Sequence, residues 1–275
     1  MTWRIGASTG CCTDTPIEPV LDALASAGMP GVEIGTPPRH FDPWRRDHVD
    51  AVRARLAATG VVPVSMHAPF GGLLDLSDPN SHHRAAAIGA ILNVALVLRE
   101  LGGRIVVVHP SDVPRGPDAA SRLSHSADSL QRLQDACDAM NITLAIETPL
   151  PHLVGGAPDE FAWLLDRVGD RARVCIDTGH TTLGRQWNAF IAAVGPRIVH
   201  VHATDHFGQY DDHLPPGDGT IDWLAIGASL RALRYDGWLM LELRCPDEPI
   251  GTFFRRAADA LASRLGADSP VGQAT

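Results

Sequence analysis

The chain has 275 residues, of which 45% are hydrophobic, so it can bury one large core, and disordered and fibrous proteins are excluded. The formal net charge is -9 and all 23 basic residues are arginine, which argues against a nucleic acid partner and excludes Schiff-base, pyridoxal-phosphate and Walker-type chemistry, each of which needs a lysine. No stretch approaches the roughly 20 apolar residues of a membrane span, and the chain opens on a strand-like segment rather than a signal peptide, which predicts a cytoplasmic protein with no membrane partner.

The predicted elements alternate between strands and helices along the whole chain. Short β-branched or apolar runs are each followed by a longer segment of helical period, with Gly, Pro or Asp at the joins. The predicted strands are Arg4–Ser8, Gly31–Gly35, Val62–His67, Arg104–His109, Thr143–Glu147, Arg173–Asp177, Ile198–His202 and Trp238–Glu242. The predicted helices are Pro16–Ala27, Pro43–Thr59, His82–Leu101, Asp118–Met140, Pro158–Val168, Gln186–Val194, Ile221–Arg234 and Thr252–Leu265.

This alternation is typical of α/β proteins, and it fits a closed (β/α)8 barrel as well as an open, doubly wound sheet. Chains of roughly 250 residues commonly form one such barrel. No repeat with a fixed consensus and no low-complexity linker divides the chain. We therefore predict one domain over residues 1–265 and a disordered C-terminal tail over residues 266–275.

Six of the predicted strands end in a side chain that can bind a divalent metal ion. These residues are His67, His109, Glu147, Asp177, His202 and Glu242. Each of them, taken alone, could lie just past its strand in water. A carboxylate that ends a buried apolar strand is a costly isolated charge unless a cation pairs with it. Because a barrel gathers its strand ends into one ring at the C-terminal mouth, six such residues favour a single (β/α)8 TIM barrel and predict a metal site at that mouth.

Two loops add further candidates. In Asp177-Thr178-Gly179-His180 a histidine follows a strand-end carboxylate, and Asp211-Asp212-His213 offers an acid and an imidazole. The five cysteines, an odd number without a C-x-x-C spacing, predict neither a thiolate zinc site nor a disulfide framework. A donor set of imidazoles and carboxylates suits Zn²⁺, Mn²⁺, Co²⁺ or Mg²⁺ in an open, catalytic site.

Six motifs occur in an order that resembles a known superfamily. They are Met66-His67-Ala68-Pro69-Phe70, Val108-His109-Pro110, Ala145-Ile146-Glu147, Ile176-Asp177-Thr178-Gly179-His180, His202-Ala203-Thr204-Asp205 and Pro216-Gly217-Asp218-Gly219-Thr220-Ile221-Asp222-Trp223. They make the chain similar to the xylose-isomerase-like TIM-barrel superfamily, which includes sugar and sugar-phosphate isomerases and epimerases, inosose dehydratases and endonuclease IV. The resemblance extends from Ile5 to about Glu242, and the segment around Glu33 is similar to the second strand of the isomerase-like members.

The resemblance to the epimerase branch implies one metal ion held by Glu147, Asp177, His202 and Glu242, with His180 beside them. It further implies that Glu147 and Glu242 are catalytic and remove and return a proton next to a carbonyl group of a small sugar, sugar phosphate or polyol. We therefore predict a metal-dependent isomerase or epimerase with a small carbohydrate substrate. Dehydration of a keto-polyol would be a variant of the same proton abstraction, and self-association as a homo-oligomer is left open.

The resemblance to endonuclease IV implies a larger set of ligands. Its additional ligands match His67, His109, Asp211 and His213, which gives nine candidates and one to three ions. An alternative function is therefore a multinuclear zinc phosphoesterase, for which a small-molecule substrate fits the acidic charge better than DNA does. A second alternative is a sugar-binding barrel without turnover. His200, in phase with His202, is predicted to lie one layer deeper as a core residue.

Overall fold

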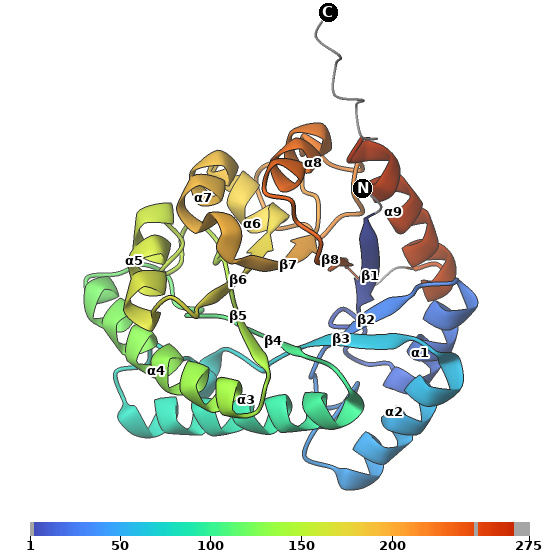
Figure 1. Ribbon diagram of the computed structural model, residues 1–275, viewed down its shortest axis with the longest axis horizontal. Coiled ribbons are helices and arrows are strands. Elements are labelled where there is room, and N and C mark those ends of the chain that lie inside the picture. The colour runs from blue at the N-terminus through green and yellow to red at the C-terminus, as the bar shows by residue number, and fades with distance from the viewer. Residues whose placement is uncertain (1–2, 245–246, 267–275) are drawn as a thin grey trace, which may run out of the picture.

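The computed structural model describes residues 3–244 and 247–266, which form a closed barrel of parallel strands inside a ring of helices (Figure 1). The strands are hydrogen bonded in chain order, and β8 pairs with β1, so the sheet closes on itself. Their bounds are β1 Arg4–Ser8, β2 Gly31–Ile34, β3 Val62–His67, β4 Ile105–Val108, β5 Thr143–Glu147, β6 Arg173–Asp177, β7 Ile198–Ala203 and β8 Trp238–Leu241. The prediction of a single (β/α)8 TIM barrel is confirmed.

The helices cover the outside of the barrel. They are α1 Ile17–Ser26, α2 Arg46–Thr59, α3 Ser81–Leu101, α4 Ala119–Ala139, α5 Pro158–Val168, α6 Thr178–Leu183, α7 Trp187–Val194, α8 Trp223–Ala232 and α9 Ile250–Arg264, with short 3-10 helices at Gly72–Leu74 and Gly195–Arg197. Among the described residues, no helix combines the length and hydrophobicity that a membrane span requires. Of the predicted tail at 266–275, residues 267–275 lie outside the described part of the chain.

Side chains alternate along each strand between the barrel interior and the helical shell. Val107, Ala145 and Cys175 form a small apolar cluster of their own, separate from the large core that packs between strands and helices. Residues two positions further along these strands share the inward direction, which includes Glu147 and Asp177. The alternation therefore directs the polar strand ends into the mouth of the barrel.

The helix α6 was not predicted, because Thr178–Leu183 is short and its threonines and glycine are poor helix formers. Local hydrogen bonds stabilise it instead. The Asp177 carboxylate caps its start by accepting from the His180 amide at 2.7 Å, and the Thr181 hydroxyl donates to the Asp177 carbonyl at 2.6 Å. The loop predicted after β6 is thus a helical turn that fixes the direction of His180. The ends of β4 and β8 also lie earlier than predicted, so His109 and Glu242 directly follow their strands.

Candidate metal centre

The ends of four neighbouring strands, β5 to β8, bring together a cluster of three carboxylates and one imidazole. It consists of Glu147, Asp177, His202 and Glu242, and each offers a ligand atom within 4.8 Å of the others. His202 Nδ1 lies 3.1 Å from Glu147 Oε1 and 3.0 Å from Glu242 Oε2. Asp177 and His202 face each other in the register of β6 and β7. All four belong to the predicted ligand set.

A second cluster shares Glu147 with the first. His67 Nε2 and His109 Nε2 lie 3.1 and 3.0 Å from Glu147 Oε2, and the ligand atoms of the three residues are again within 4.8 Å of one another. The Asp112 carboxylate contacts His109 Nδ1 at 2.6 Å and the Ala68 carbonyl accepts from His67 Nδ1 at 2.9 Å. Each imidazole therefore directs its Nε2 atom towards Glu147.

The remaining three predicted ligands form a third group at the rim. Asp211 Oδ2 lies 3.2 Å from His180 Nε2 and 2.9 Å from His213 Nε2. His213 has a positive φ of 49°, which a residue with a side chain rarely adopts, and its Nδ1 atom contacts the Glu242 carbonyl at 2.9 Å. The structure thus brings all nine predicted residues to one mouth.

Asp205 holds the loop that carries Asp211 and His213. Its buried carboxylate accepts hydrogen bonds from the His206, Gly217 and Ile221 amides and from the Trp223 indole at 2.7 to 3.1 Å. Its backbone also forms a reciprocal pair with Leu214 at 2.9 Å. The segment from His202 to Trp223, which contains two of the six motifs, is thus a structural unit organised by Asp205. Asp205 belongs to the first of these motifs but is not one of the nine predicted ligands.

A buried polar layer lies directly below the first cluster, and it was not predicted as part of the site. Glu33 is fully buried and contacts His202 Nε2 at 3.1 Å and His200 Nε2 at 3.0 Å, while the Ser8 and Ser65 hydroxyls donate to its carboxylate at 3.0 and 2.8 Å. His200 lies in the core, as predicted. Glu33 fixes the ring of His202, because a carboxylate on Nε2 leaves Nδ1 free to face the mouth.

The charges of the site depend on one another. Burial alone would lower the pKa of His109, but the carboxylates of Glu147 and Asp112 raise it to about 10. Burial likewise opposes the rise in the pKa of His180 to about 10, which Asp177 and Asp211 cause. Without a metal ion, these imidazoles therefore hold protons at neutral pH, and a divalent cation would have to displace them.

The donor set fits a divalent metal ion. Asp177 Oδ2 is buried and has no hydrogen-bond partner among the described residues, and burial raises the pKa of this carboxyl to about 6. Such an oxygen is costly unless a cation lies nearby. Imidazole nitrogens and carboxylate oxygens are ligands that both Zn²⁺ and Mn²⁺ bind. Both the first and the second cluster could hold an ion.

Two cavities open at this mouth. The metal-side cavity, of about 270 Å³, is lined by Glu147, His180, Asp211 and His213. The proline-side cavity, of about 370 Å³, is lined mainly by residues at the ends of β1 and β3 and in the segments that follow β1, β2 and β3. Phe70 and Glu242 line both. The candidate site therefore has two compartments.

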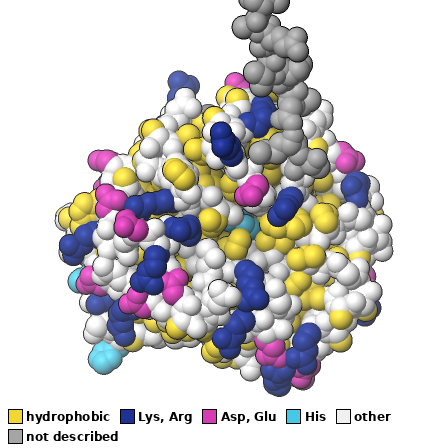
Figure 2. Space-filling view, in the orientation of Figure 1, with side chains coloured by type: hydrophobic (Ala, Val, Ile, Leu, Met, Phe, Trp, Pro, Cys, Tyr) yellow, Lys and Arg dark blue, Asp and Glu magenta, His cyan; other side chains and the backbone are white. Residues whose placement is uncertain are grey.

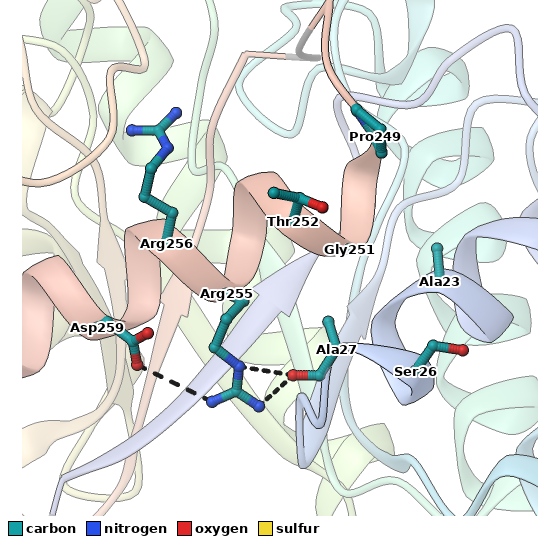
Figure 3. Close-up of a pocket in the computed structure, with 9 residues that line it drawn as sticks. All are labelled: Ala23, Ser26, Ala27, Pro249, Gly251, Thr252, Arg255, Arg256 and Asp259. Carbon is teal, nitrogen blue, oxygen red and sulfur yellow. Dashed lines mark hydrogen bonds and ion pairs between the residues drawn. The ribbon is translucent and has the colours of Figure 1, made fainter.

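A larger cavity, of about 760 Å³, lies elsewhere, on the outside of the barrel between α1 and α9 (Figure 3). None of the nine predicted residues lines it. The Arg255 guanidinium turns back to donate to the Ala27 carbonyl at 2.6 Å and lies 4.0 Å from Asp259.

Figure 2 shows Arg, Asp and Glu side chains interspersed over the visible face, without a broad patch of basic residues there.

The fold and these clusters define a (β/α)8 barrel with a mouth that could bind metal ions. A family model described as Xylose isomerase-like TIM barrel matches residues 21–264, and the chain belongs to this family. The resemblance drawn from the motifs is thereby confirmed.

Three relatives show the range of the family. An uncharacterized protein of Methanocaldococcus jannaschii, MJ1311, is 25% identical over 66% of this chain, which spans 64% of that protein's length. A D-psicose 3-epimerase of Agrobacterium fabrum is 22% identical over 82% of this chain and 78% of its own. A protein named "Probable endonuclease 4" of Acholeplasma laidlawii is 26% identical over 42% of this chain and 40% of its own.

The solved structures agree on the fold. A D-tagatose 3-epimerase-like protein superposes with a TM-score of 0.82 at 19% identity, covering 96% of this chain and 98% of its own. The relatives and structural neighbours thus include proteins named as sugar epimerases.

Proposed function

We propose that the protein is a divalent-metal-dependent isomerase or epimerase that moves a proton at a carbon next to a carbonyl group of a small sugar or polyol. The observation that carries this proposal is the first cluster, in which Glu147 and Glu242 both contact His202 Nδ1, at 3.1 and 3.0 Å, with Asp177 beside them. Similarity to sugar epimerases over most of the chain supports it.

The chain's own residues would supply the acid and base. Burial would raise the pKa of Glu147, but His202 and His109 hold it well below its usual value. Burial also opposes the lowering of the Glu242 pKa by His202. Both carboxylates are therefore ionised at neutral pH and able to accept a proton from carbon. Glu242 is the more accessible of the two, with a side chain 20% exposed against 2% for Glu147.

The residues that would hold the ion are Glu147, Asp177, His202 and Glu242. A divalent ion bound there would act as a Lewis acid that polarises the substrate oxygens. Glu33 would hold His202 in the tautomer whose Nδ1 atom faces the site. The rim residues would order the substrate and exclude water from the carboxylates.

The test is proton exchange with solvent. The metal-loaded protein is incubated in D₂O with D-fructose, D-tagatose or D-psicose, and NMR follows deuterium at the carbon next to the carbonyl. Glu147→Gln and Glu242→Gln should each abolish incorporation while the fold is retained. Full incorporation in either variant would refute the catalytic roles, and full activity in chelator would refute the metal dependence.

A specific observation favours a second candidate, a multinuclear phosphoesterase. The second cluster places His67 and His109 on the other carboxylate oxygen of Glu147, so His67, His109 and Glu147 would hold a second ion. The group of His180, Asp211 and His213 could hold a third. Neighbouring ions can activate a nucleophile and stabilise a leaving oxygen. Release of p-nitrophenol from bis(p-nitrophenyl) phosphate, without deuterium incorporation into sugars, would select this function, and metal binding without either activity would select a sugar-binding barrel.

A further inference from the structure

The two cavities at the mouth differ in chemistry, and Phe70 lies where they meet. Its ring is stacked on His109 with 4.0 Å between ring centroids, and 53% of the residue is exposed. The metal-side cavity is lined by the carboxylates and imidazoles described above. The proline-side cavity is lined by Pro37, Pro38 and Pro69 and by the hydroxyl residues Ser8, Thr13 and Thr36.

The described lining of the proline-side cavity offers an anionic group no cation that is free of other partners. None of its described lining residues is an arginine, and the chain has no lysine. His67 lines it, but Nδ1 contacts the Ala68 carbonyl and Nε2 contacts Glu147. Glu242, also in its wall, adds a negative charge. A phosphate held there would lose its hydration without gaining a positively charged partner, which disfavours its binding.

Two backbone amides of this cavity already have partners. The Gly35 amide donates to Thr9 Oγ1 at 3.0 Å, and the Gly10 amide donates to Ser8 Oγ at 3.5 Å. Two arginines lie close in sequence to lining residues of this cavity. Arg39 is exposed and pairs with Asp14 at 3.2 Å, and Arg244 is exposed and lines neither cavity. The described lining of the cavity therefore lacks an arginine or lysine side chain that could pair with phosphate or carboxylate.

Its features match an uncharged hydroxylated carbon chain instead. The Thr36 hydroxyl donates to the His67 carbonyl at 3.0 Å and keeps lone pairs with which it can accept. The prolines and the exposed face of Phe70 provide apolar surface for C–H groups. A few polar groups in an apolar wall are typical of small-molecule sites.

We propose that the substrate is an unphosphorylated keto-sugar or polyol that spans both cavities, with its reacting carbons in the metal-side cavity and its uncharged, hydroxylated end in the proline-side cavity. Phe70 lines both cavities, so its ring would set the path that the carbon chain of the substrate takes from one cavity to the other. The assignment of the reacting end rests on the proposed isomerase or epimerase function, whereas the assignment of the distal end rests on the lining of the proline-side cavity.

Binding tests this proposal independently of turnover. Calorimetry on the Mn²⁺-loaded protein compares D-fructose and D-tagatose with their 6-phosphates. The free ketoses should bind at least about tenfold more tightly, since the ester would desolvate its phosphate without a partner. Tighter binding of the esters, or no binding of either ketose, would overturn the proposal. Binding of the ketoses without deuterium exchange would refute the proposed reaction and leave the assignment of the distal end intact.

Two arginine-to-alanine substitutions test whether an exposed arginine binds the phosphate of a sugar phosphate. Arg39→Ala and Arg244→Ala should leave the ratio of ketose to ester affinity unchanged within about twofold, as exposed positions usually do. A selective loss of ester affinity in either variant would identify a phosphate-binding arginine and overturn the proposal.

A gain of affinity provides the reciprocal test. Pro38→Arg introduces a guanidinium at an exposed position of the proline-side cavity, and it should tighten ester binding at least about tenfold relative to the matched control Pro38→Ala. An unchanged ratio would show that the distal end does not lie there.

Phe70→Ala should raise KM for a free ketose about tenfold with kcat nearly unchanged and metal content intact, and an unchanged KM would remove Phe70 from the proposal.

Discussion

Neutralising Glu147 without changing its volume tests the architecture of the mouth most severely. The carboxylate lies 3.0 to 3.1 Å from His67, His109 and His202, and it belongs to both the first and the second cluster. At an effective dielectric constant of about 20, opposite unit charges at 3 Å attract by roughly 5 kcal/mol. Because breaking a buried pair strands the remaining charge, Glu147→Gln should lower the free energy of unfolding of the metal-free protein by about 3–5 kcal/mol.

For a chain of this size, that loss corresponds to a fall in melting temperature of about 6–20 °C. The affinity for Mn²⁺ should fall at least about 100-fold, because removing a ligand should exceed the 10- to 100-fold effect of losing a residue that merely supports one. Calorimetry and metal titration measure the two effects. Glu100→Gln is the matched control, since Glu100 pairs with Arg46 and Arg53 on the surface and should contribute less than about 1 kcal/mol. Wild-type metal affinity in Glu147→Gln would refute the reasoning.

Three further changes test other parts of the site. Glu242→Gln should reduce deuterium incorporation at least about 100-fold with little change in melting temperature, because it removes a base from a partly exposed position, and retained incorporation would contradict its role. Asp205→Ala should lower the free energy of unfolding by about 3 kcal/mol and speed amide hydrogen exchange over residues 206–222, because three buried or partly buried amides and the buried Trp223 indole lose their acceptor; unchanged exchange would contradict the role of Asp205 in holding this loop. In the metal-free protein the raised pKa of His109 contributes stability that is fully present below its ordinary 6.5 and is lost as pH rises through about 10, so the melting temperature should fall from pH 7 to 10, whereas a rise would refute that charge assignment.

The sequence predicted the barrel because its strands end in residues that make sense only when gathered in a ring. His67 and Glu242 lie far apart in the chain, and the (β/α)8 topology brings them to one mouth. Glu33 could not be assigned in the same way. Its partners His200 and His202 lie 167 and 169 residues away, and no local spacing links them. The alternation of side chains in the short strand Gly31–Ile34 indicates which way the Glu33 carboxylate points, but it does not identify the side chains that the carboxylate contacts.

The loop between β7 and α8 shows the same limit on a smaller scale. The spacing of Asp211 and His213 predicted that both could turn inward, and in the structure Asp211 contacts both His213 and His180. The reason lies in Asp205, whose four acceptor contacts reach residues up to 18 positions further along the chain. This set of hydrogen bonds to Asp205 depends on the folded conformation of the loop, so residue types and spacing alone do not reveal it.

The metal content of protein purified without added metal tests the central claim most directly. Elemental mass spectrometry should find at least one divalent ion per chain, which a chelator removes together with deuterium exchange and which re-addition restores. One exchangeable ion would fit the isomerase or epimerase, and two or three zinc ions would favour the phosphoesterase. Absence of any bound ion, with full exchange activity in the presence of chelator, would contradict the account.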